Sequence, residues 1–99
     1  MLKNFRCYQM AKEIHQLTEK LPIKGEVRSQ LSRATLSIVL NLAEGSGKFE
    51  KKEQKRFFKI AFASIRETQA ILDLLENQEV VAKVDSLAAA TWRLIGPPE

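Results

Sequence analysis

The helical character of the chain is clearest in residues 26–47, which read EVRSQLSRATLSIVLNLAEGSG. Apolar residues recur here every three or four positions, the spacing that places side chains on one face of an α-helix. This first stripe consists of Val27, Leu31, Ala34, Ile38 and Leu42. The run Gly45-Ser46-Gly47 predicts the end of the helix, because glycine favours the C-cap and the turn beyond it. We therefore expect a helix over about residues 26–44.

The same helix carries a second apolar stripe, roughly opposite the first, which consists of Leu36, Val39, Leu40 and Ala43. A helix in a small bundle normally buries a single face. The second stripe must then be covered by another protein chain or leave an apolar patch in water. We expect a homo-oligomer whose interface includes these four residues. The alternative is an unusually buried central helix.

Three further segments show helical spacing of their apolar residues, over about residues 5–21, 51–76 and 79–95. The breaks between and after the helices fall at Pro22 and Gly25, Asn77-Gln78, and Gly96-Pro97-Pro98. No stretch alternates apolar and polar residues for long enough to predict a strand. A chain of 99 residues suits one domain. The predicted fold is an all-α, antiparallel up-down-up-down four-helix bundle that forms a single domain over residues 1–99.

The third helix, over residues 51–76, separates into two faces. The face predicted to meet the core contains Phe57, Ile60, Ala61, Ser64, Thr68, Ile71, Leu72 and Leu75. The opposite face carries Lys52, Lys55, Lys59 and Arg66. Phe58 and Phe62 project beside this basic face, where a purely solvated surface would not need aromatic rings, so we assign both to the oligomer interface. The alternative is an ordinary solvated helix surface.

Positive charge is concentrated in one part of the chain. The net charge is +4, and residues 47–59 carry six lysines and arginines against two glutamates, whereas residues 60–99 have a net charge of −3. Lysine and arginine near phosphates release condensed counterions, which favours binding of RNA or DNA. The candidate phosphate contacts are Lys48, Lys51, Lys52, Lys55, Arg56, Lys59 and Arg66. We expect them to contact the phosphate backbone with little readout of bases.

No arrangement of residues in the sequence supports an enzyme class or a zinc site. Cys7 and His15 are the single cysteine and the single histidine, too few for an intramolecular disulfide or a zinc cluster. The run Gly45-Ser46-Gly47-Lys48 resembles the end of a phosphate-binding loop but lacks its first glycine and its final Ser or Thr. We predict no catalytic residue, metal or cofactor. The charged first residues and the absence of a long apolar run predict a cytoplasmic protein without a membrane segment.

Two segments resemble a bacterial family of four-helix-bundle proteins. Its members are encoded by intervening sequences in large-subunit ribosomal RNA genes. Residues 33–48, RATLSIVLNLAEGSGK, are similar to its central signature, and residues 56–68, RFFKIAFASIRET, to its long third helix. The family includes relatives of the accessory variability protein of diversity-generating retroelements. Its motif residues here are Asn41, Ala43, Glu44, Gly45 and Gly47. Val39 stands where many members have proline, and Glu50 is a weaker helix cap than the usual Ser, Thr or Asp.

The resemblance implies a four-helix protomer that assembles into a ring, typically a pentamer. It also implies a basic surface that engages nucleic acid or a reverse-transcriptase partner. We therefore expect a non-enzymatic homo-oligomer that binds nucleic acid, RNA before DNA, through the basic face of its third helix. The alternative function is a protein-binding adaptor or scaffold, for example for a reverse transcriptase.

Overall fold

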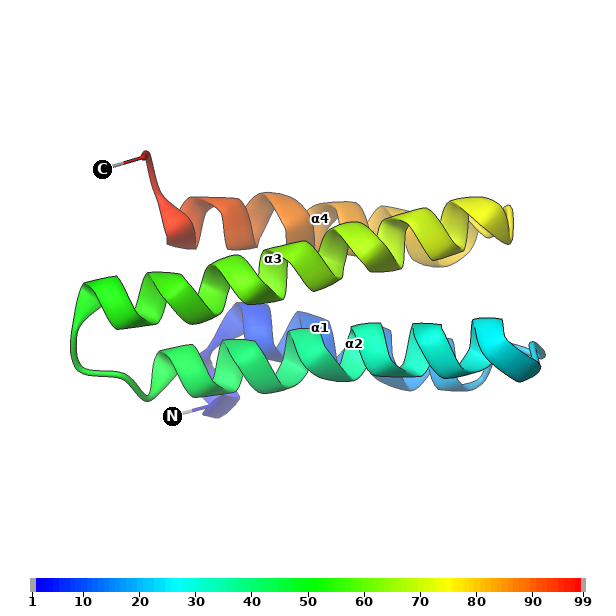
Figure 1. The fold of residues 1–99 in the computed structure, drawn as a ribbon, viewed down its shortest axis with the longest axis horizontal. Helices are drawn as coiled ribbons and strands as arrows, with labels where there is room; N and C mark the ends of the chain where they lie inside the picture. Colours follow the sequence, from blue (N-terminus) through cyan, green and yellow to red (C-terminus); the bar gives the residue numbers. More distant parts are fainter. Residues whose placement is uncertain (1, 99) are drawn as a thin grey trace.

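Four α-helices and one short turn of 3-10 helix form the structure, a computed structural model that describes residues 2–98 (Figure 1). The elements are η1 (Leu2–Asn4), α1 (Arg6–Glu19), α2 (Gly25–Ser46), α3 (Lys51–Leu74) and α4 (Gln78–Ile95). No strand occurs in the described residues, so the predicted all-α fold with four helices is confirmed. Each helix begins and ends within two residues of its predicted position.

The four helices lie side by side and share one core. The helix α2 packs against α1 and α3, and α4 packs against α3 and α1. In Figure 1 the α2–α3 connection lies at the same end of the molecule as both ends of the described chain, and the α3–α4 connection lies at the other end. The molecule measures 40 × 26 × 21 Å. Its longest dimension is close to the length of α3, whose 24 residues span ~36 Å at about 1.5 Å per residue.

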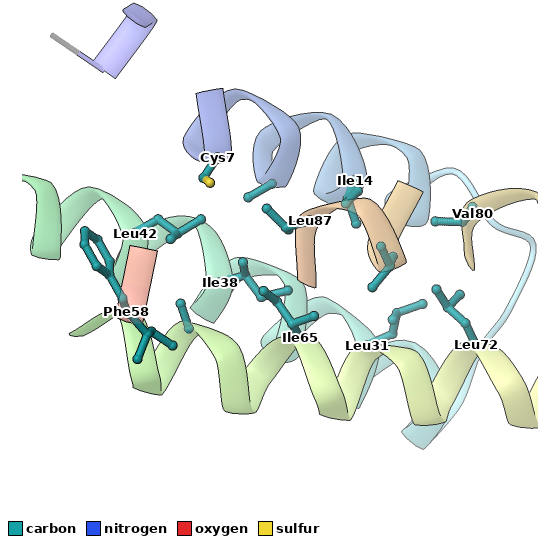
Figure 2. Close-up of a cluster of buried hydrophobic side chains, with 14 residues drawn as sticks. Cys7, Ile14, Leu31, Ile38, Leu42, Phe58, Ile65, Leu72, Val80 and Leu87 are labelled. Carbon is teal, nitrogen blue, oxygen red and sulfur yellow. The ribbon is translucent and has the colours of Figure 1, made fainter. Parts of the chain in front are cut away.

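Aliphatic side chains from all four helices fill the core (Figure 2). The largest fully buried ones are Ile14, Leu31, Ile38, Leu42, Ile65, Leu72, Val84 and Leu87. Each helix also buries one threonine. The hydroxyls of Thr18, Thr35 and Thr68 donate to backbone carbonyls three or four residues earlier in the same helix. These bonds satisfy the hydroxyls locally, which makes their burial inexpensive.

The core face of α2 is the predicted one. Leu31, Ala34, Ile38 and Leu42 are all buried. Val27, the remaining residue of the first stripe, is exposed in the first turn of the helix. The periodicity of the apolar residues therefore identified the inward direction of this helix correctly.

The core face of α3 agrees with the predicted one at Ala61, Thr68 and Leu72, which are buried, and differs from it at other positions. Phe58 and Ile65 are buried, whereas Ile60 is 40% exposed and Phe57 is partly exposed. The assignment of Phe58 to an oligomer interface was wrong, because its ring lies in the core with its centroid 6.1 Å from that of Phe5. Apolar residues cover more than half of the helix circumference between positions 57 and 65, so periodicity alone did not define the inward direction.

The end of α2 also differs from the prediction. The helix continues through Gly45 and Ser46, and Gly47 is its C-cap with φ −90° and ψ −3°, a right-handed conformation. Gly45 is buried against α3, and a Cβ added to it would lie 2.7 Å from Cε1 of Phe58. Glycine is thus present at this position for close helix packing, not to end the helix.

Candidate nucleic-acid interface

The basic residues predicted to contact phosphate lie along α3 and the connection before it. Lys51, Lys52, Arg56, Lys59 and Arg66 are exposed, and Lys48 and Lys55 are partly buried. Lys52, Lys55, Arg56 and Lys59 line one shallow hollow of about 420 Å³ on the surface of α3. Arg66 lies seven residues beyond Lys59, ~10 Å further along the helix axis at about 1.5 Å per residue. The structure therefore brings four of the seven candidates together and leaves Arg66 apart.

Lys48 and Arg56 each lie beside a carboxylate of the same chain. Lys48 Nζ lies 3.2 Å from Glu44 Oε2, and Arg56 Nε donates to Glu53 Oε1 at 3.1 Å. Both pairs are exposed to solvent, where an ion pair contributes only about 0–1 kcal/mol. A phosphate could therefore replace either carboxylate at little cost.

Lys48 and Arg56 also share a cation–π contact with the ring of Phe57. Its ring centroid lies 5.2 Å from Lys48 Nζ and 4.5 Å from Arg56 Cζ, distances at which the ring face attracts a cation. Phe57 was predicted to face the core. Its ring links Arg56, in the first turns of α3, to Lys48 in the α2–α3 connection.

Three exposed lysines and Arg66 have no carboxylate partner among the described residues. Within residues 2–98, Lys51, Lys52 and Lys59 form no ion pair or hydrogen bond through their side chains. Arg66 donates to Gln69 Oε1 at 3.1 Å and meets no carboxylate of the described chain. Their positive charge is accordingly available to an anion from solution.

The second stripe of α2 is only partly exposed. Leu36 is 44% and Leu40 57% exposed, while Val39 packs against the core and Ala43 is partly buried. The two leucines line a hollow of about 550 Å³ together with Arg33, Asn41 and Glu67. The apolar surface that another chain could cover is therefore narrower than the four-residue stripe and centres on Leu36 and Leu40.

The motif residues of α2 have identifiable contacts within the protomer. Asn41 donates through Nδ2 to the carbonyl oxygen of Ser37 at 2.9 Å, and Ser64 donates to Ser37 Oγ at 2.8 Å. This polar link joins α2 to α3 beside the Leu36–Leu40 surface. Glu44 pairs with Lys48, and Gly45 contacts Phe58, as described above.

A second groove was not predicted from the sequence. Trp92 of α4 is 59% exposed, and its ring lies 5.4 Å from that of Phe62 on α3, measured between centroids. The groove has a volume of about 300 Å³, and Lys55 and Lys59 lie along it. The one sequence feature that could have indicated this groove is the single tryptophan, at a surface position of the last predicted helix. Its proximity to the basic face depends on how α3 and α4 pack.

The described residues contain no cluster of three or more His, Cys, Asp or Glu side chains placed to hold a metal ion. Cys7 is a buried free thiol, and burial raises its pKa above the ordinary value of 9.0. None of the helices within residues 2–98 combines the length and hydrophobicity needed to span a bilayer.

Comparison with known proteins identifies one family. The family model described as 23S rRNA-intervening sequence protein matches residues 5–91, a segment that begins just before α1 and ends in the last turns of α4. No curated protein and no solved structure matches the chain. The match covers far more than half of the sequence, and the resemblance carried by residues 33–48 and 56–68 is thereby confirmed. The chain belongs to the 23S rRNA-intervening sequence protein family.

Proposed function

We propose that the protein is a non-enzymatic, cytoplasmic, nucleic-acid-binding homo-oligomer, and that RNA is its main ligand. Its subunit is an antiparallel up-down-up-down bundle, and several copies, typically five, form a ring. The observation that carries this proposal is the grouping of Lys52, Lys55, Arg56 and Lys59 around one hollow of α3. Four cations on one exposed surface suit a string of phosphates better than a single small anion.

Electrostatics supports phosphate binding by this surface. Each cation placed near a phosphate releases counterions, so affinity falls steeply as salt rises. One subunit offers few such contacts. A ring repeats the surface once per copy, and several weak contacts on one strand then add to a much higher apparent affinity.

The surface around Leu36 and Leu40 supports self-association. Two exposed leucines one turn apart form an apolar centre, and Arg33 and Glu67 border the same hollow with opposite charges. Opposite charges at one patch favour a second copy of this chain, because Arg33 of one copy can meet Glu67 of the next.

Binding of labelled RNA, titrated at several salt concentrations, tests the proposal. The variant K52Q/K55Q/K59Q removes three charges of the α3 surface. We expect it to bind more weakly and to lower the salt slope of the logarithm of affinity by about 2, at ~0.7 per phosphate contact for a single strand. K12Q/K20Q/K24Q is the matched control, because it removes three exposed lysines from α1 and the segment after it. Equal losses in both variants, or no wild-type binding at about 50 mM salt, would contradict the proposal.

A protein-binding adaptor, for example for a reverse transcriptase, is the second candidate function. The exposed leucines of α2 favour it, since a different protein could cover them as well as another copy. Such a partner should co-purify after nuclease treatment. The triple lysine variant should then slow association more than it shortens the lifetime of the complex.

A further inference from the structure

The groove between α3 and α4 combines an exposed aromatic surface with positive charge. The rings of Trp92 and Phe62 are inclined to each other by 52°, with 5.4 Å between their centroids. Phe62 is partly buried and packs against the core, so it supports Trp92 from one side. Trp92 remains 59% exposed. This is unusual for tryptophan, because contact of its large aromatic surface with water is unfavourable. Much of the Trp92 ring is therefore open to solvent beside a partly buried Phe62.

The end of α4 builds the second wall of this groove. Gly96 has φ 75° and ψ −173°, a backbone conformation that residues with a side chain rarely adopt. Its N–H donates to the carbonyl oxygen of Trp92 at 3.1 Å, which closes the last turn. The helix ends here, and Pro97 and Pro98 line the groove together with the buried residue Ile95.

Two lysines of α3 place positive charge at the same groove. Lys55 and Lys59 are one helical turn apart, and Phe62 follows Lys59 by three residues, so all three share one side of α3. Lys55 Nζ lies 3.8 Å from the position that a Cβ on Gly96 would occupy, which places its ammonium beside the turn. The groove volume of about 300 Å³ is at the lower end of the range for ligand sites, enough for a single flat group.

We propose that this groove binds single-stranded nucleic acid by stacking one unpaired base on Trp92, while neighbouring phosphates contact Lys55 and Lys59. The proposal rests on the proposed function and adds the class of ligand. An aromatic face stacks on any base, and nearby cations hold the backbone, so such a site tolerates sequence but requires an unpaired base. In a duplex the bases are already stacked inside the helix. The family match ends at Thr91, one residue before Trp92, and so does not cover the end of α4 that forms this groove.

Fluorescence offers a direct test, because Trp92 is the single tryptophan of the chain. The intact protein is titrated with short oligouridylate, with oligothymidylate, with an abasic strand of the same length, and with a duplex. We expect both single strands with bases to quench the emission of Trp92, and the abasic strand and the duplex to leave it unchanged. The affinity for oligouridylate should exceed that for the abasic strand by about 5- to 150-fold, as expected for one base stacked on an aromatic ring. The ratio of the affinities for oligouridylate and oligothymidylate shows whether RNA or DNA is preferred.

Variants at Trp92 separate stacking from phosphate binding. With fluorescently labelled oligouridylate, W92A should lose most of the preference over the abasic strand, and W92F should retain most of it. F49A is the matched control, because Phe49 is a fully exposed aromatic residue in the α2–α3 connection outside the groove. Circular dichroism verifies that each variant is folded.

Four results would overturn the inference, and they differ in what they mean for the proposed function. If all strands bind equally and W92A changes nothing, the groove does not stack bases, but phosphate binding by α3 stands. If no strand binds at low salt, both proposals fail. An equal loss in W92A and F49A would show that the groove has no special role. A blue shift of Trp92 emission with protein concentration alone would show that another copy covers the groove.

Discussion

The Phe58 ring packs directly on the backbone of α2 at Gly45, where Cε1 of the ring lies 2.7 Å from the position that a glycine Cβ would occupy if it were present. Cδ1 of the same ring is 2.9 Å away, and Cβ of Phe57 is 3.1 Å away. The two helices therefore approach closely just before the connection that carries the first basic residues. This contact links a residue of the family motif to the rotation of α3, and hence to the direction in which its lysines point.

Replacement of Gly45 by alanine should destabilise the protein. Alanine is the better helix former by about 1 kcal/mol, but its methyl group would meet the Phe58 ring, and overpacking of a core costs about 1–3 kcal/mol. We expect a lower midpoint in urea unfolding. G47A is the control, because the nearest atom to an added Cβ there is the carbonyl oxygen of Glu44 at 3.6 Å. A gain of stability in G45A would contradict the close contact.

Replacement of Leu36 or Leu40 by glutamate should dissociate the proposed oligomer. A charge at the centre of an apolar interface loses its hydration without gaining a partner, which costs several kcal/mol per copy. Light scattering measures the mass of each variant. L74E is the matched control, because Leu74 is 81% exposed at the end of α3, away from this surface. A wild-type protein that scatters as a monomer would contradict both the interface and the ring.

Replacement of Arg28 by alanine should weaken the connection between α1 and α2. The Arg28 guanidinium donates to the carbonyl oxygens of Thr18 and Leu21 and approaches Glu19, so it satisfies acceptors at the end of α1. Loss of these charged hydrogen bonds should cost about 1.5–3 kcal/mol in the free energy of unfolding. R6A is the control, since Arg6 is exposed and forms no ion pair or side-chain hydrogen bond within residues 2–98. Equal effects of the two variants would show that the hydrogen bonds of Arg28 contribute little.

Cys7 should react slowly with thiol reagents in the folded protein. The side chain is buried, and burial raises the pKa of the thiol above its ordinary value of 9.0, so little thiolate forms near neutral pH. Because the folded pKa is the higher one, the associated stability is fully present well below the ordinary pKa of 9.0 and is lost as the pH rises through that value toward the folded pKa. The wild type should therefore lose more unfolding free energy than C7A between about pH 8 and pH 10. Rapid labelling of the native protein at neutral pH would contradict the buried position.

The helices and their limits follow closely from local sequence signals. The spacing of apolar residues, together with Pro22, Asn77 and the glycines, predicts every helix to within two residues of its observed limits. These signals act through backbone conformation and through neighbours one turn away, so they do not require knowledge of the rest of the chain. The same holds for the inward face of α2, where polar residues separate the two apolar stripes.

The rotation of α3 was not predictable in the same way. Its apolar residues cover too wide an arc, and the choice between Phe57 and Phe58 depended on which ring could enter the space above Gly45. The candidate site changes with this rotation. Phe58 lies in the core instead of on the surface, and Phe57 lies beside Lys48 and Arg56.

By itself, the sequence determined the all-α class, the number of helices, their limits and the basic character of α3, because each depends on composition or on residues within a turn or two. The tertiary structure alone decided that Phe57 of α3 lies beside Lys48 and that Trp92 of α4 lies beside Phe62 and Lys59 of α3. Contacts between helices depend on how each helix is rotated and how closely it packs. The rotation of a helix and the closeness of its packing depend on the fit of particular side chains, such as the Phe58 ring against Gly45. The periodic spacing of apolar residues carries no information about this fit.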